Sequence, residues 1–298
     1  MKNNLLINGL IISVISISWS SLAWDKTIPS GSLRIPEPGN VQIITTTDGS
    51  TNIGHITEIT GSKVLFTTEL GSITIPFDRI QSIREVPASS IHNGNYWFPD
   101  PNNTRLFFAP TGRMLKKGSG YFADYYLFFP SANYGVTNRL SLGGGFSIFP
   151  SGNMKEQVYF FTPKIGVKQT EKLNIAAGAL VLKIPDIADE KTPLLSIIYG
   201  AGTYGTADRS LTVGLGYGMV DLELANKPLI VIGGEQRLTR RMALVTENWI
   251  IPGTDHPLIS LGLRFMGEWL SVDLALINTI GKDSVSPGIP YIDFVYNF

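Results

Sequence analysis

The chain has 298 residues, with 24 Lys and Arg against 24 Asp and Glu, so its formal net charge at neutral pH is zero. This balance gives no indication of nucleic acid as a partner or of a strongly charged substrate. The sequence contains no cysteine, which excludes disulfides, a lipid-modified cysteine and zinc sites built on thiolates. Glycine and aromatic residues are plentiful and helical periodicity is missing, so an all-β chain is expected after the first residues.

Residues 1–23 have the three parts of a signal peptide. Lys2 precedes an apolar run over 5–17, and Ser21, Leu22 and Ala23 form the small-x-small pattern that signal peptidase cuts. Cleavage there predicts an exported chain that begins at Trp24. The alternative is an uncleaved anchor, but the apolar run is shorter than the roughly 20 residues of a membrane-spanning helix.

A short N-terminal extension, 24–39, leads into a small β module over 40–87. Its alternating runs are separated by glycine-containing turn signals at 48–49, 60–61 and 70–71. We expect about five strands, the size of a small closed barrel; their predicted ranges are 41–46, 53–59, 63–68, 72–76 and 80–86.

The module resembles SH3-like or Sm-like small barrels. In these, a strand ending in Asp-Gly is followed by a strand with a glycine and later by an Ile-Pro-x-x-x-Ile motif; the matching residues here are Asp48, Gly49, Gly54, Ile75, Pro76 and Ile80. The resemblance covers about 45 residues and concerns the fold alone. Residues 88–103 then form a predicted linker, whose Tyr96, Trp97 and Phe98 are expected to rest on a membrane surface or on the mouth of the next domain.

From residue 104 onward the pattern is that of a β-barrel. In segment 210–219 apolar residues at odd positions alternate with Ser, Thr and Gly at even positions, and segments 139–148, 259–265 and 270–276 alternate similarly. Tight and long connections follow one another in turn, which favours an antiparallel transmembrane barrel of about twelve strands over 104–298, beginning near Arg105. An even strand number puts the module and the C-terminus on the tight-turn side. A soluble periplasmic β-sandwich is the alternative, since it also alternates.

The C-terminal strand resembles the closing strand of Gram-negative outer-membrane β-barrel proteins, and the resemblance extends over 104–298. The matching residues are Ile292, Phe294, Tyr296 and Phe298, which share one face of an extended strand. The resemblance implies an outer-membrane location, surrounding lipid and an assembly signal for the barrel assembly machinery. It also places the tight-turn side, and with it the module, in the periplasm.

Five ionisable residues fall on the face opposite the leucines: Glu235, Arg237, Glu247, Arg264 and Asp273. An arginine or lysine exposed to lipid at the membrane midplane costs about 2–4 kcal/mol, so these side chains are predicted to face the lumen and to form a charge network. That network is either structural or a selectivity lining. Seven glycines are also predicted to face inward: Gly143, Gly145, Gly200, Gly202, Gly214, Gly216 and Gly218.

We predict no enzyme, catalytic residue, cofactor or metal site. The histidines, His55, His92 and His256, lie in three separate regions, without a nucleophile elbow or metal-ligand spacing. The expected role is therefore structural, anchoring or scaffolding, with a periplasmic protein partner for the module. The first alternative is a narrow channel for small polar solutes or ions. A third is a surface hydrolase, built on His256 and its neighbour Asp255.

Overall fold

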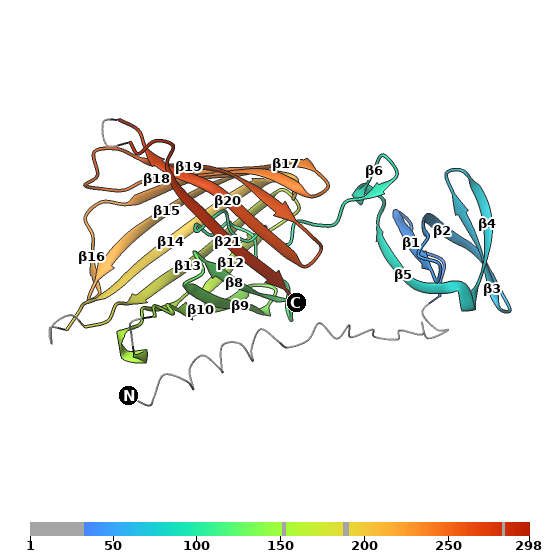
Figure 1. The fold of residues 1–298 in the computed structure, drawn as a ribbon, viewed down its shortest axis with the longest axis horizontal. Coiled ribbons are helices and arrows are strands. Elements are labelled where there is room, and N and C mark those ends of the chain that lie inside the picture. Colours follow the sequence, from blue (N-terminus) through green and yellow to red (C-terminus); the bar gives the residue numbers. More distant parts are fainter. Residues whose placement is uncertain (1–32, 151–152, 187–190, 282–283) are drawn as a thin grey trace, which may run out of the picture. The chain divides into compact units, whose positions relative to one another are not determined.

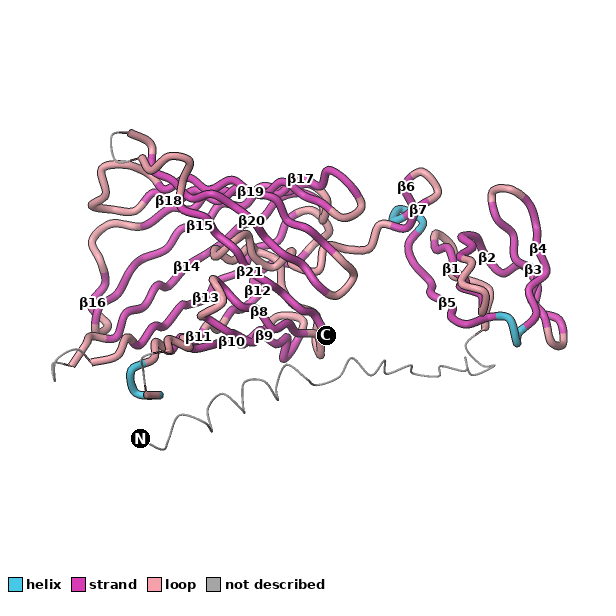
Figure 2. The backbone as a smooth tube through the Cα atoms, in the orientation of Figure 1, coloured by secondary structure: helices cyan, strands magenta, loops and turns pink. Residues whose placement is uncertain are grey.

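The structure, a computed structural model, describes residues 33–150, 153–186, 191–281 and 284–298, and the chain divides into two compact units between Tyr96 and Trp97. The predicted signal peptide and most of the N-terminal extension lie outside the described residues. Strands form nearly all the regular structure in both units (Figure 2). Among the described residues, no helix has the length and apolar character needed to cross a membrane.

The first unit is a five-stranded antiparallel sheet whose strands agree with the predicted ranges to within two residues. Its order is β4-β3-β2-β1-β5, with the single helical turn η2 (Phe77–Arg79) between β4 and β5. The core contains Ile44, Ile56, Val64 and Phe66, all fully buried. The strands are β1 (Asn40–Thr46), β2 (Thr51–Thr60), β3 (Lys63–Thr68), β4 (Gly71–Pro76) and β5 (Ile80–Pro87).

Glu85 of β5 holds the segment before β1 against the sheet. Its carboxylate accepts hydrogen bonds from Asn40 Nδ2 (2.8 Å), the Glu37 backbone N–H (3.0 Å) and Arg34 Nη2 (2.9 Å). These bonds, led by that from Asn40, lower the pKa of Glu85. The described part of the predicted extension is thus packed on the module. After β5 come η3 (Ala88–Ser90) and the short hairpin of β6 (Ile91–His92) and β7 (Asn95–Tyr96).

The second unit is a closed antiparallel β-barrel of twelve strands (Figure 1). The barrel closes because β21 pairs with β8. The elements β11 and β12 count as one interrupted strand, since both lie between β10 and β13. Short β16 (Glu223–Leu224) extends one hairpin, and η4 (Met154–Glu156) lies in the loop after β10. The barrel strands are β8 (Gly120–Tyr125), β9 (Phe129–Thr137), β10 (Leu140–Phe146), β11 (Tyr159–Phe161), β12 (Lys164–Gln169), β13 (Leu173–Lys183), β14 (Leu194–Gly205), β15 (Arg209–Val220), β17 (Leu229–Thr239), β18 (Met242–Ile250), β19 (Leu258–Met266), β20 (Leu270–Thr279) and β21 (Ile289–Asn297).

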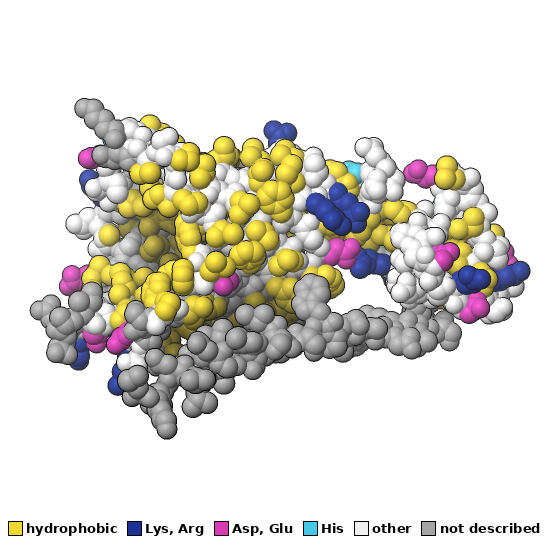
Figure 3. All heavy atoms as spheres, viewed as in Figure 1, with side chains coloured by type: hydrophobic (Ala, Val, Ile, Leu, Met, Phe, Trp, Pro, Cys, Tyr) yellow, Lys and Arg dark blue, Asp and Glu magenta, His cyan; other side chains and the backbone are white. Residues whose placement is uncertain are grey.

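The strand alternation sorts side chains between an apolar exterior and a more polar interior. Figure 3 shows hydrophobic side chains over much of the visible barrel surface. Ser141, Thr212 and Ser260 are buried in the interior. The exposed apolar residues include Leu142, Leu211, Val213, Leu215, Leu261, Phe265, Leu274 and Leu276. A closed sheet with this exterior satisfies the two demands of a bilayer, which are paired backbone groups and an apolar surface.

Two predictions about the barrel were wrong in detail. The first strand begins at Gly120 and not near Arg105, because residues 104–119 turn into the barrel interior. One proline, two arginines and adjacent apolar residues interrupt the alternation there, so this stretch cannot form a strand with one face in lipid. Gly200 and Gly202 lie opposite the exposed Leu215 and Val213, so they belong to the outer face, whereas Gly214 lies opposite the buried Ala201.

Candidate functional site: a segment held inside the barrel

Residues 97–119, which we call the inner segment, run inside the barrel and form its most elaborate polar site. The segment enters beside Phe98, near the tight turn between β17 and β18, and returns to the same end of the barrel before β8. Between these points Thr111 N–H donates to Thr104 O (3.0 Å) and an isolated bridge joins Arg105 to Pro110. The segment is therefore a re-entrant hairpin with its tip at 106–109.

Arg264 on β19 is the centre of the interior network and is fully buried. Its Nε and Nη2 donate to the two oxygens of Asp273 (2.8 and 2.9 Å), which lies directly opposite on β20. Its Nη1 lies 2.9 Å from Glu235 Oε2 and 3.3 Å from Asp100 Oδ2. It also donates to two backbone oxygens of the inner segment, those of Asn102 (3.1 Å) and Leu106 (2.8 Å). One guanidinium thus joins two barrel strands to the hairpin.

Glu247 on β18 holds the tip of the hairpin. Its Oε2 accepts hydrogen bonds from three successive backbone N–H groups, those of Phe107 (2.9 Å), Phe108 (3.0 Å) and Ala109 (2.9 Å). Its Oε1 accepts from Trp249 Nε1 (2.7 Å). Three converging N–H groups form a concave anion site, so the carboxylate binds the tip as a ligand would.

Small residues beside Glu247 and Arg264 leave room for the hairpin. Glu247 lies opposite Gly233 and Ser260, and Arg264 lies opposite Ala243. A Cβ on Gly233 would come within 2.5 Å of the Leu106 side chain and 2.3 Å of a backbone oxygen of β18. The hairpin tip therefore packs directly on barrel backbone at Gly233.

Arg105 of the inner segment pairs with the terminal strand. Its Nη2 lies 2.6 Å from Asp293 Oδ2, and both side chains are buried. The guanidinium also lies over the Tyr125 ring, 4.9 Å from its centroid. Tyr291 donates its hydroxyl to the same Asp293 oxygen (2.7 Å). The terminal strand thus contributes to the interior network as well as to barrel closure.

The returning half of the hairpin is bound to the other side of the barrel. Lys164 Nζ donates to Thr104 O (3.0 Å) and Arg113 O (2.6 Å), and Thr203 Oγ1 accepts from Gly112 N–H (2.8 Å). Gln169 Nε2 donates to Gly112 O (2.9 Å). A Cβ on Gly112 would lie 2.0 Å from a backbone oxygen of β13, so glycine allows the segment to contact the wall.

All five predicted lumen residues lie in the barrel interior and are buried, but their partners differ from a simple set of mutual ion pairs. Arg264 contacts Asp273 and Glu235 as proposed, whereas Glu247 binds backbone N–H groups. Arg237 pairs with Asp208 (3.0 Å) and donates to Phe98 O (2.7 Å). The sequence interpretation missed four interior residues, Asp100, Arg105, Asp293 and Lys164. Only Asp293 could have been predicted to face the lumen, because strand alternation puts it on the face opposite to that of Phe294.

The predicted aromatic contact of the linker falls inside this site. The Arg237 guanidinium carbon lies 5.0 Å from the centroid of Trp97 and 5.3 Å from that of Phe98. Phe98 is buried. Trp97 and Phe98 thus rest on the barrel mouth, whereas Tyr96 of the same predicted set lies against Arg84 of the module, whose guanidinium carbon is 5.8 Å from the Tyr96 ring centroid.

The terminal residue closes the barrel seam. Phe298 N–H donates to Gly120 O (2.9 Å), and the Phe298 carbonyl oxygen accepts from Gly120 N–H (3.0 Å). Its ring lies 4.9 Å from that of Phe122. Tyr296 and Phe298 face outward, and Asp293 and Val295 face inward. Ile292 and Phe294 share the outward side of β21 by alternation.

Replacement of Phe298 by Asp is expected to lower the amount of inserted barrel, because it puts a charge on the outer face where the first and last strands meet. Phe298→Tyr retains the ring and should insert like the unmodified chain. Heat-modifiable gel migration of isolated membranes measures the inserted fraction. Equal insertion of Phe298→Asp would remove the assembly role predicted for this residue.

The histidines lie on three different elements of the chain. His55 lies on β2, His92 on β6 and His256 in the loop after β18. Among the described residues no three His, Cys, Asp or Glu side chains are grouped so that they could hold a metal ion. The interior carboxylates are instead occupied by Arg264, Arg105 and the backbone of the inner segment.

Comparison with known proteins returns only distant structural likenesses. No protein-family model and no curated protein sequence matches the chain. A solved NanC porin structure is 7% identical, covers 60% of this chain and 97% of its own, and has a TM-score of 0.37. OmpT, an outer membrane protein of Vibrio cholerae, is 13% identical over 87% of this chain and 95% of its own, with a TM-score of 0.31. OmpF of Salmonella typhi, solved with daunomycin, is 9% identical over the same shares, with a TM-score of 0.32.

These scores are too low for any inference from the neighbours to this chain. The second unit of this chain has the architecture of a porin-like outer-membrane β-barrel, because its sheet is closed and its exterior is apolar.

Proposed function

We propose that the chain is an integral outer-membrane barrel, closed by its own inner segment, that anchors the N-terminal module on the periplasmic side. The observation that carries the proposal is the binding of the hairpin tip by Glu247 and Arg264 deep in the barrel. A polar pore would need those groups to face water. Here they are buried against the hairpin, which favours an anchor over an open channel.

The path of the chain supports a periplasmic position for the module. The inner segment starts at the tight-turn end of the barrel, which faces the periplasm in outer-membrane barrels. The module would then present β4 to a periplasmic protein, since among the described residues β4 pairs with β3 alone. An edge strand of this kind can accept a strand from a partner.

Planar-bilayer recording of the mature chain tests the anchor against the channel. We expect no steady conductance from the full-length protein, because the hairpin occupies the lumen. A stable open current from unmodified protein would instead support the alternative function, a narrow channel for small polar solutes or ions.

Anchoring itself is tested by cutting the chain between its units. A site-specific protease sequence inserted after Gly94, in the turn between β6 and β7, should allow cleavage in isolated outer membranes. The expected result is release of the module and retention of the barrel. If the uncut chain were already extracted by a high-pH wash, the membrane assignment itself would fail.

A further inference from the structure

A cavity of about 180 Å³ lies inside the barrel beside the inner segment. The inner segment supplies six residues to its wall, which are Thr104, Arg105, Phe108, Ala109, Pro110 and Leu115. The remaining lining comes from the barrel strands, including the halves of β13, β14, β17 and β18 nearer the long loops. The cavity therefore borders the contacts that hold the hairpin tip, because Phe108, Ala109 and Trp249 belong to both.

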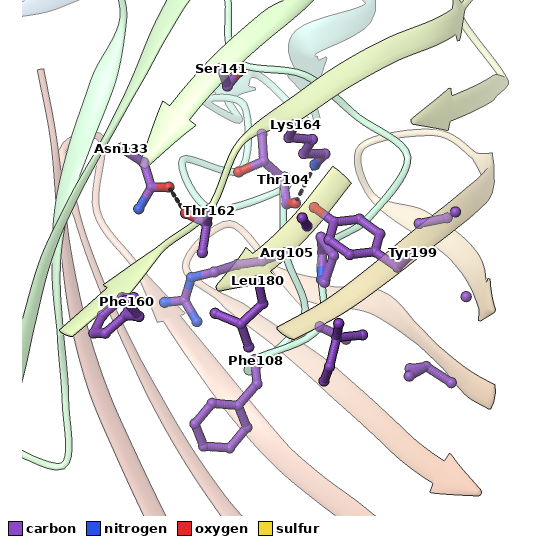
Figure 4. A pocket seen from close by; sticks show the side chains of 18 of the residues that line it. Thr104, Arg105, Phe108, Asn133, Ser141, Phe160, Thr162, Lys164, Leu180 and Tyr199 are labelled. Carbon is purple, nitrogen blue, oxygen red and sulfur yellow. Dashed lines mark hydrogen bonds between the residues drawn. The ribbon is translucent and has the colours of Figure 1, made fainter. Parts of the chain in front are cut away.

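The lining is divided between an apolar and a polar part. Figure 4 shows Phe108, Phe160 and Leu180 in one region, and Ser141, Asn133, Thr162 and Lys164 in another. Ile197, Val231 and Trp249 add to the apolar wall. An apolar cavity of about 150 Å³ accepts a benzene molecule, so this one has room for an apolar group of that size.

The polar part contains the basic side chain of Lys164, which has no carboxylate partner among the described residues. Lys164 Nζ contacts two neutral backbone oxygens, those of Thr104 and Arg113, and no carboxylate pairs with it in the described part of the chain. Of the interior acids, Asp293 pairs with Arg105 and Asp273 with Arg264. An ammonium holds three donors, so Lys164 retains one for a further acceptor.

A second donor in the wall, the Ser141 hydroxyl, has no hydrogen-bond partner among the residues that the structure describes. Ser141 is only 6% exposed. Asn133 receives a weak hydrogen bond on Oδ1 from Thr162 (3.4 Å), which leaves its amide donors for another group. A buried hydroxyl without a partner is costly, and an acceptor in the cavity would remove that cost.

We propose that this cavity binds a small amphipathic carboxylate, with an apolar body about the size of a benzene ring against Phe160, Leu180 and Trp249, and the carboxylate at Lys164 and Ser141. In the complex the carboxylate pairs with the protonated amine of Lys164, and the apolar body fills the rest of the space. The cavity volume is too small for a diacyl lipid.

Calorimetric titration of the full mature chain in lipid nanodiscs tests the proposal, with empty nanodiscs as the blank. Benzoate is the probe, benzyl alcohol the neutral analogue and acetate the anion without a ring. We expect saturable binding of benzoate, about tenfold or more tighter than of benzyl alcohol, since a hydrogen bond to a charged group is the stronger kind. Equal affinity for the two, or no saturable binding of benzoate, would overturn the proposal.

Substitutions locate the site. Lys164→Gln should weaken benzoate binding to the level of benzyl alcohol, while Lys168→Gln, which changes an exposed lysine of the same strand, should leave it unchanged. Leu180→Trp fills the apolar part and should abolish binding of both ring compounds. If the Lys164→Gln protein did not insert into the membrane, the Leu180→Trp variant alone would test the site. Unchanged benzoate affinity in the Leu180→Trp variant would refute it.

Discussion

Replacement of Arg264 by alanine is expected to destabilise the barrel by about 3–5 kcal/mol, because it leaves three buried carboxylates without the cation they share. Asp273 loses a two-point pair, and Glu235 and Asp100 lose their contacts with Nη1. The inner segment also loses two backbone hydrogen bonds, at Asn102 and Leu106. Equilibrium urea unfolding of the reconstituted barrel, followed by tryptophan fluorescence, measures the change.

Two variants separate the charge effect from a general loss of packing. Arg264→Ala combined with Asp273→Ala should recover part of the lost stability, since it removes one unpaired carboxylate. Arg241→Ala, at an exposed position in the tight turn after β17, should change stability by no more than about 0.5 kcal/mol. If Arg264→Ala unfolded like the unmodified barrel, the interior network would contribute nothing to its stability.

The sequence predicted the barrel because lipid imposes a period of two on every strand. Leucine at 211, 215, 261 and 274 could face only outward, and that choice turned Arg264 and Asp273 inward. The inward or outward direction was mispredicted at Gly200 and Gly202, because a glycine has no side chain that shows which face it belongs to. The strands and the inward charges could thus be derived from one rule.

The inner segment follows no such rule. Its contacts are made largely by backbone groups: Glu247 binds N–H groups of residues 107–109, and Lys164 binds two carbonyl oxygens. Backbone donors and acceptors are present at almost every residue and leave no mark on the sequence. The available clue was Asp293, which the alternation of the terminal strand had already turned inward.

Replacement of Glu247 by alanine is expected to release the hairpin tip and convert a closed barrel into a conducting one. The change leaves three backbone N–H groups, at Phe107, Phe108 and Ala109, without their acceptor. An unsatisfied buried donor costs about 1–3 kcal/mol, so the bound position loses several kcal/mol unless water reaches the tip. Water can do so only if the hairpin moves away from the wall.

Single-channel recording and limited proteolysis measure this release together. Glu247→Ala should show discrete openings absent from the unmodified chain, and cleavage by added protease should appear within 97–119. Glu171→Ala, at an exposed turn acid, should show neither. Glu247→Gln should lie between them, because one amide oxygen can still accept from the tip while its NH₂ faces the Trp249 N–H. A Glu247→Ala barrel that stays silent and resists protease would mean that Arg264, Arg105 and Lys164 hold the segment without the carboxylate.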